Sequence, residues 1–209
     1  MPFVDIFDSG FRTGRKVCLL APGPNGRDHY GEIPADHQVI AISKAVLIPE
    51  VEAQIWVNPR TELEWFEEAN RSFPGVRIFH VDAAREIEAE LPGCESCYSF
   101  ELQMDDDVCL QPHEMRPIVP GVIRGNGSIS GAAIQIAYHC GAREMLLCGI
   151  DMSGDAYFDG TFTLDQHHGT TWWFTPRLNM LIRWMIERGG CQVRTLSPTR
   201  LDVARYAGE

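Results

Sequence analysis

Short runs of consecutive apolar residues recur along the chain, and segments with helical spacing separate several of them. The runs are KVCLLA (16–21), QVIAIS (38–43), AQIWV (53–57), VRIFHV (76–81), EMLLCG (144–149) and CQVRTL (191–196). Most positions in the first five runs are apolar, whereas a strand with one exposed face would alternate apolar and polar residues. This pattern is typical of strands in a parallel sheet that is covered on both faces.

Four segments between or beside these runs are predicted to be helical. They are TELEWFEEANRS (61–72), a short helix near 83–90, SISGAAIQIAYHCG (128–141) and PRLNMLIRWMIERGG (176–190). The first begins with a capping-box pattern, and the last two end at glycine, a common helix stop. The alternation predicts a single Rossmann-like α/β domain over residues 1–209, with a mainly parallel sheet and helices on both faces.

Residues 91–124 interrupt this order and are predicted to form an irregular insertion. Pro, Gly and Cys break every period there, and Asp105–Asp107 form an acidic run that is typical of a surface turn but also resembles a divalent-metal motif. Two interpretations of three cysteines and a histidine in this segment stay open, a zinc site or free thiols on the cysteines. The residues concerned are Cys94, Cys97, Cys109 and His113.

Charge and composition restrict the partners. Acidic residues outnumber basic ones, 29 to 18, which gives a net charge of −11. Such a surface repels nucleic acid and anionic lipid, so an anionic ligand needs a local site of backbone N–H groups, helix N-termini or a few cations. We expect no membrane span and no signal peptide, and the apolar surroundings of Cys18, Cys148 and Cys191 favour a cytoplasmic location.

Candidate binding residues lie where the predicted strands end, the edge at which open α/β sheets bind ligands. The first strand leads into APGPNG, where Gly23 and Gly26 allow the backbone to approach a phosphate closely, although neither a dinucleotide fingerprint nor a P-loop is present. A later strand ends in Gly149-Ile150-Asp151. A phosphate site and an ordinary tight turn both fit the first of these segments.

Two further segments carry polar groups suited to chemistry. In IRGNGSISGAA, Gly127, Ser128 and Ser130 precede or open a helix, where backbone N–H groups favour an oxyanion; an ordinary N-cap is the alternative. In FDGTFTLDQHHGTTWWF, the adjacent His167 and His168 are candidates for proton transfer, although a solvated polar loop also fits.

Taken together, these segments resemble two related groups of proteins. GSISGAAIQIAYHCGAREMLLCGIDMS is similar to the signature of a bacterial and archaeal family that includes an archaeal hydroxymethyldihydropterin pyrophosphokinase. The same segment, with Tyr157-Phe158-Asp159 after it, resembles the bacterial sialyltransferases of glycosyltransferase family 42. LLAPGPNG, WVNPRTELEWFEEA and CQVRTLSPTRL extend the likeness to residues 16–59 and 125–201.

The resemblance to sialyltransferases implies a transferase that takes a nucleotide-activated donor, a cytidine monophosphate (CMP) sugar, without a metal or other cofactor. His168 or His167 is then the general base, and the Tyr157 hydroxyl assists the leaving phosphate. The implied nucleotide contacts are Gly23, Pro24, Asn25, Ser43, Asn58, Gly127, Ser128, Ser130 and Asp151. Two departures are Pro22 in place of an asparagine in the first turn and Ser43 in place of an asparagine on the second strand.

Two other functions stay open at this point. One is a Mg²⁺-dependent pyrophosphokinase acting on a hydroxymethyl heterocycle, with carboxylates drawn from Asp151, Asp155 and Asp159. The other is a protein that binds a nucleotide without turnover. The implied partners are a nucleotide or nucleotide-sugar and a small-molecule or glycan acceptor, and a homo-oligomer is possible.

Overall fold

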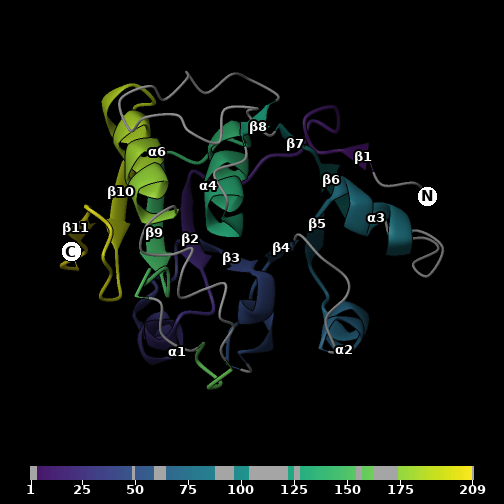
Figure 1. The fold of residues 1–209 in the computed structure, drawn as a ribbon, viewed down its shortest axis with the longest axis horizontal. Coiled ribbons are helices and arrows are strands. Elements are labelled where there is room, and N and C mark those ends of the chain that lie inside the picture. The colour runs from purple at the N-terminus through teal and green to yellow at the C-terminus, as the bar shows by residue number, and fades with distance from the viewer. Residues whose placement is uncertain are drawn as a thin grey trace.

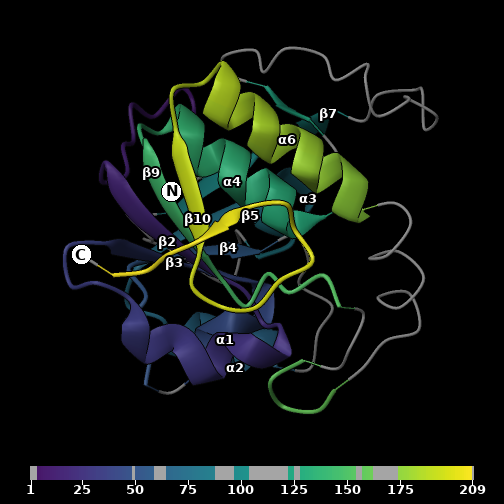
Figure 2. The same ribbon diagram turned by 90° about the vertical axis from the view of Figure 1, so that its left-hand side faces the viewer.

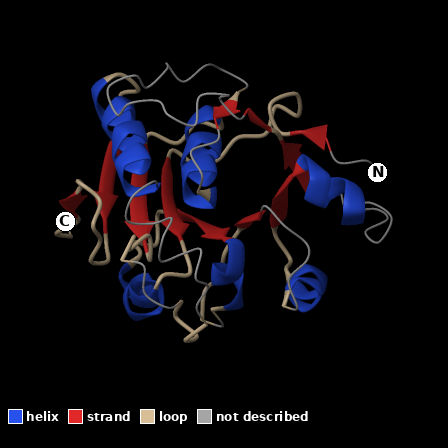
Figure 3. Cartoon of the chain, in the orientation of Figure 1, coloured by secondary structure: helices blue, strands red, loops and turns tan. Residues whose placement is uncertain are grey.

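The fold was examined in a computed structural model that describes residues 4–48, 50–58, 65–87, 97–103, 122–124, 128–153, 157–161 and 174–208. Within these residues, nine strands form one sheet in the order β1-β6-β5-β4-β3-β2-β9-β10-β11, and every pair of neighbours is parallel. The predicted parallel α/β fold is confirmed. Figure 3 shows the strands as one layer between helices.

The elements have the following bounds. The strands of the large sheet are β1 Val4–Asp5, β2 Lys16–Leu20, β3 Gln38–Ile42, β4 Ile55–Asn58, β5 Val76–His80, β6 Cys97–Phe100, β9 Glu144–Cys148, β10 Gln192–Thr195 and β11 Ala204–Arg205. A separate parallel pair consists of β7 Leu102–Gln103 and β8 Ile123–Arg124. The helices are α1 Pro24–His29, α2 Phe66–Ser72, α3 Val81–Ile87, α4 Ile129–His139 and α6 Thr175–Glu187, and the 3₁₀ helices are η1 Tyr30–Glu32 and η2 Ser43–Leu47.

Both faces of the sheet are buried, as the continuous apolar runs predict. On β2, Val17 and Leu19 pack into the cluster that contains the buried residues of α4 and α6. Cys18 and Leu20 point the other way and pack with residues of α2 and α3. Figures 1 and 2 show α4 and α6 on one side of the sheet and α1 and α2 on the other. Successive side chains of a strand alternate between the two faces, which explains why nearly every strand position is apolar.

The described residues of the predicted irregular insertion at 91–124 include the short strands β6, β7 and β8. Cys97–Phe100 form β6, an internal strand that pairs with β5 on one side and β1 on the other. β6 is only four residues long, and Pro, Gly, Cys and Glu residues precede it in the sequence. The sequence is therefore too short there to show a strand period. Its place in the sheet comes from pairing with β5 rather than from local pattern.

The order of the strands reverses at β2. From β2 the chain adds β3, β4, β5 and β6 successively on one side, and it then adds β9, β10 and β11 on the other. The adjacent carboxyl ends of β2 and β9 are therefore the topological switch point, where open α/β sheets form a ligand crevice. Among the described residues, no helix is long and apolar enough to cross a membrane.

Candidate functional site

The loop that follows β2 packs directly on the loop that follows β9. The Gly23 N–H donates to the Gly149 carbonyl (3.0 Å), and the Ala21 N–H donates to the Cys148 carbonyl (2.8 Å). A Cβ atom on Gly23 would collide with that same Gly149 carbonyl and lie 2.5 Å from Asp151 Oδ2. Gly23 is therefore required by the contact between two loops of this chain. The contact that this glycine makes is with the β9 loop, and its predicted approach to a phosphate stays a prediction.

Asp151 joins three loops at the switch point. Its Oδ2 accepts from the Asn25 N–H (2.9 Å), and its Oδ1 accepts from the Ser197 hydroxyl (3.2 Å). The Ser197 Oγ in turn accepts from the Gly149 N–H (2.8 Å). Asp151 is only 4% exposed. The carboxylate thus fastens the loops after β2, β9 and β10 to one another.

Burial raises the pKa of Asp151, and the hydrogen bonds from Asn25 and Ser197 oppose that rise only in part. A buried carboxylate loses the solvation that stabilises its charge, so the neutral acid is more favoured than it is for a carboxyl group exposed to water. Both oxygens of Asp151 accept hydrogen bonds from the chain, and its contact with a nucleotide stays a prediction.

The loop after β10 contributes three residues that the sequence did not assign to the site. Besides Ser197, the Thr199 hydroxyl donates to the Ile150 carbonyl (2.6 Å), and the Arg200 N–H donates to the Asp151 carbonyl (3.0 Å). The segment Ser197-Pro-Thr was visible as part of the likeness to sialyltransferases. Its function in closing the switch point depends on β10 being the neighbour of β9, which no local pattern reveals.

Ser43 and Asn58 lie at the same carboxyl edge of the sheet. Ser43 follows β3, the neighbour of β2, and Asn58 ends β4, the next strand beyond β3. The register pairs Ile42 with Val57, so Ser43 and Asn58 are the next residues along two adjacent strands. Ser43 has a positive φ of 50°, and its carbonyl accepts a hydrogen bond from the buried Trp56 indole (3.0 Å). Asn58 is fully buried. A left-handed serine is unusual and is here held in place by the indole donor.

The start of α4 lies at this edge as well. At the C-terminal end of α4, the Cys140 carbonyl accepts a hydrogen bond from the Thr13 N–H (2.9 Å), and Thr13 lies just before the amino end of β2. The helix therefore runs antiparallel to the strands and begins at their carboxyl ends. Ser128 is the N-cap, and its Oγ accepts from the Ser130 N–H (3.2 Å). The ordinary N-cap is therefore present, in a position that also suits an anion. Gly127 lies outside the described residues.

A tight turn, Tyr157–Thr161, extends over the ends of β2 and β3. The Phe158 N–H donates to the Pro22 carbonyl (3.0 Å), and the Tyr157 N–H donates to the Thr161 carbonyl (2.8 Å). Lys44, from η2, forms an ion pair with Asp159. The turn therefore lies beside the loop after β2, and the assignment of the Tyr157 hydroxyl to the leaving phosphate stays a prediction. His167 and His168 lie outside the described residues, so their assignment stays a prediction.

The candidate metal sites find no support among the described residues. Cys97 is disulfide-bonded, so its sulfur is not a thiolate that could bind zinc. Within the described ranges, no group of three His, Cys, Asp or Glu side chains is placed to hold a metal ion. The remaining residues named for metal sites, which are Cys94, Cys109, His113, Asp105–Asp107 and Asp155, lie outside these ranges.

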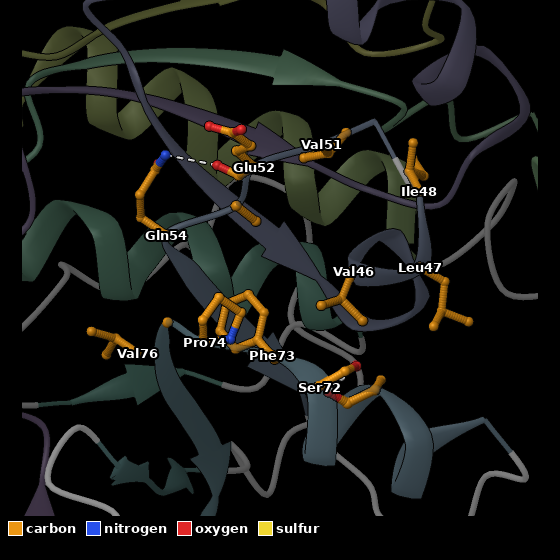
Figure 4. A pocket seen from close by; sticks show the side chains of 13 residues that line it. Val46, Leu47, Ile48, Val51, Glu52, Gln54, Ser72, Phe73, Pro74 and Val76 are labelled. Atoms are coloured by element: carbon orange, nitrogen blue, oxygen red, sulfur yellow. Dashed lines mark hydrogen bonds between the residues drawn. The ribbon is translucent and has the colours of Figure 1, made fainter.

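A cavity of about 680 Å³ lies away from this edge. Figure 4 shows it between η2, the segment before β4 and the end of α2, with Val46, Val51, Phe73 and Val76 among its lining residues. Gln54 and Gly75, which also line it, precede β4 and β5, so the cavity is toward the amino ends of those strands. Parallel sheets bind ligands at the opposite edge, and this cavity contains none of the predicted site residues.

Comparisons with known proteins identify the fold. No protein-family model matches the sequence, and no curated protein matches it. Solved structures do match. The sialyltransferase CstII from Campylobacter jejuni in complex with the substrate analogue CMP-3FNeuAc superposes with a TM-score of 0.55 at 12% identity, covering 93% of this chain and 87% of that one.

Two further sialyltransferase structures agree. CstII in complex with cytidine-5'-monophosphate gives a TM-score of 0.54 at 12% identity, over 89% of this chain and 82% of that one. A variant of Cst-II in complex with CMP gives 0.55 at 11% identity, over 90% and 86%. At such identities the likeness concerns the fold, and the chain accordingly has the fold of these sialyltransferases along most of its length.

Proposed function

We propose that this protein is a glycosyltransferase that uses a CMP-sugar donor, bound at the carboxyl ends of β2 and β9. The observation that carries the proposal is the convergence of the predicted nucleotide contacts on one edge. Asn25, Ser43, Asn58, Ser128 and Asp151 are far apart in sequence, and each lies at or just beyond the end of a strand or at the start of α4. The structures of similar fold were solved with CMP or a CMP-sugar analogue, which supports this choice of nucleotide.

The residues divide into binding and chemical functions. The turn at Gly23-Pro24-Asn25, together with Ser43 and Asn58, would hold the nucleoside. The N-terminus of α4, with Ser128 and Ser130, would neutralise the phosphate through backbone N–H groups and the helix dipole. Because the chain has a net charge of −11, this local site must overcome an unfavourable general field.

The chemical step needs one base and one donor to the leaving group. The acceptor hydroxyl oxygen attacks the anomeric carbon of the sugar while the bond from that carbon to the phosphate oxygen breaks. CMP leaves with the bonding electron pair, His168 takes the hydroxyl proton, and the Tyr157 hydroxyl stabilises the leaving phosphate. His167 is the alternative base.

Nucleotide binding is the first test. Thermal unfolding is measured with CMP, UMP, AMP and GMP, each with Mg²⁺ and with a chelator. We expect CMP to stabilise the protein in both conditions, by about 2.7 kcal/mol when its concentration is 100 times Kd. Stabilisation by none of the nucleotides would contradict the proposal, and stabilisation by AMP only with Mg²⁺ would favour pyrophosphate transfer.

The general base is tested by substitution. His168→Ala should lower turnover of a CMP-sugar about 100-fold, the scale of a general base, and should leave CMP affinity unchanged. His167→Ala is the matched control and should have a smaller effect. If His168→Ala lowers CMP affinity as much as turnover, the residue contacts the ligand and is not the base.

A further inference from the structure

Lys44, Asp159 and Thr161 form a polar cluster that connects two loops at the carboxyl edge. The Lys44 ammonium forms an ion pair with Asp159 and donates to the Thr161 Oγ1 (3.1 Å). The Thr161 hydroxyl and N–H both donate to Asp159 Oδ1, at 2.7 and 3.1 Å. The Lys44 side chain is only 13% exposed and that of Asp159 29%, so water weakens this pair less than it would a surface pair.

The electrostatics of Asp159 agree with a paired carboxylate. Partial burial acts to raise the pKa of Asp159, but hydrogen bonds from Lys44 and Thr161 outweigh it and lower the pKa below its ordinary value. The ionised form is thus the favoured one in the folded protein, and the pair remains charged at neutral pH.

The turn that carries Asp159 also carries Tyr157. The Tyr157 N–H donates to the Thr161 carbonyl, and the Gly160 N–H donates to the Tyr157 carbonyl (2.9 Å), so residues 157–161 are internally bonded. Two anchors attach this turn to the sheet edge. One is the Phe158 N–H on the Pro22 carbonyl, and the other is Lys44. The backbone of Tyr157 is therefore held between the loop after β2 and the loop after β3.

The start of η2 gives Lys44 a fixed origin. Its neighbour Ser43 is held in a left-handed conformation by the indole N–H of Trp56, a residue with no exposed surface. A cation on a rigid element defines a position better than one on a mobile loop. Both anchors of the turn come from loops that the proposed function assigns to the nucleotide.

We propose that Lys44 is a positioning residue that, through Asp159, sets Tyr157 against the leaving phosphate of the donor. This inference rests on the proposed function. Lys44 has no chemical step of its own; it keeps the turn in the register in which the phenol reaches the phosphate. Misplacing a catalytic group by about 1 Å can lower a rate about 100-fold, so the pair should affect turnover far more than affinity.

The test compares Lys44→Met and Asp159→Asn with the conservative variant Lys44→Arg, which keeps a cation at position 44. Met retains an apolar stem, which limits loss of packing. Lys16→Met is the matched control, because Lys16 forms an ion pair with Asp36 (2.8 Å) at the amino edge of the sheet. We expect kcat for the CMP-sugar to fall about 100-fold in Lys44→Met and Asp159→Asn, with CMP affinity unchanged, and to stay close to the wild-type value in Lys44→Arg.

Hydrogen exchange at the amides of Tyr157, Phe158 and Gly160 gives a readout that does not need activity. Exchange should be faster in Lys44→Met than in Lys16→Met. Unchanged exchange would overturn the proposal even if the wild type shows no transferase activity. Faster exchange with unaltered kcat, or equal losses of kcat and CMP affinity, would also overturn it, the latter because Lys44 would then contact the ligand. A wild type with no CMP binding would contradict the proposed function instead.

Discussion

Replacing Asp151 removes the group that joins three loops at the switch point. In Asp151→Ala, the Asn25 N–H and the Ser197 hydroxyl lose their acceptor in a site that is nearly closed to water. A buried polar group without a partner costs about 1–3 kcal/mol, and the serine hydroxyl can rotate to another acceptor more readily than a backbone N–H. We therefore expect the free energy of unfolding to fall by about 2–4 kcal/mol.

Asp151→Asn should be much milder. The amide oxygen can accept from the Asn25 N–H while the amide NH₂ donates to Ser197 Oγ, and no charge is buried. We expect a change within about 1 kcal/mol. Asp202→Ala is the control, because that carboxylate is exposed and forms only a 3.6 Å ion pair with Arg183. Its removal should change stability by less than about 0.5 kcal/mol.

Urea unfolding followed by tryptophan fluorescence measures these differences, since Trp56 is fully buried and changes its environment on unfolding. The reasoning fails if Asp151→Ala costs no more than Asp202→Ala. It also fails if Asn is as damaging as Ala, because the carboxylate charge rather than its acceptors would then hold the loops.

The same variants give a prediction for pH. The folded-state pKa of Asp151 lies above its ordinary value of 3.8, so between these two values the native state binds more protons than the unfolded state. The contribution of this group to stability is then largest below 3.8 and decreases as pH rises through the folded-state pKa. Wild type should lose stability relative to Asp151→Asn over that window. A difference that is constant with pH would contradict the raised pKa.

Two further substitutions test the edge of the sheet. Gly23→Ala should destabilise the protein by about 3 kcal/mol in urea unfolding, because the new Cβ meets the Gly149 carbonyl. Gly31→Ala is the control and should be near neutral, because nothing lies within 4 Å of a Cβ at that position. Equal effects of the two substitutions would refute the contact. Trp56→Phe should cost about 2 kcal/mol through lost packing and the lost donor to the Ser43 carbonyl, and an unchanged urea midpoint would show that the indole N–H is not needed.

Local pattern identified the strands β2, β3, β4, β5, β9 and β10 and the helices α2, α3, α4 and α6. Continuous apolar runs such as those at β2 and β9 identify strands buried on both faces, because a residue on either side of such a strand meets a helix. Gly141, with a φ of 114°, ends α4 as predicted, since a left-handed residue favours glycine. The placement of the candidate residues after strands followed from the same pattern.

Tertiary structure decided what sequence periodicity cannot encode. The strand β6 is too short to show a period and forms through pairing with β5 and β1. The hydrogen-bond partners of Asp151 come from positions 126 and 46 residues away in the chain. Lys44 carries no motif, and its ion pair with Asp159 forms only because η2 lies beside the Tyr157–Thr161 turn. In each case the determining contact is long-range, and it exists only once strand order has brought separate loops to one edge.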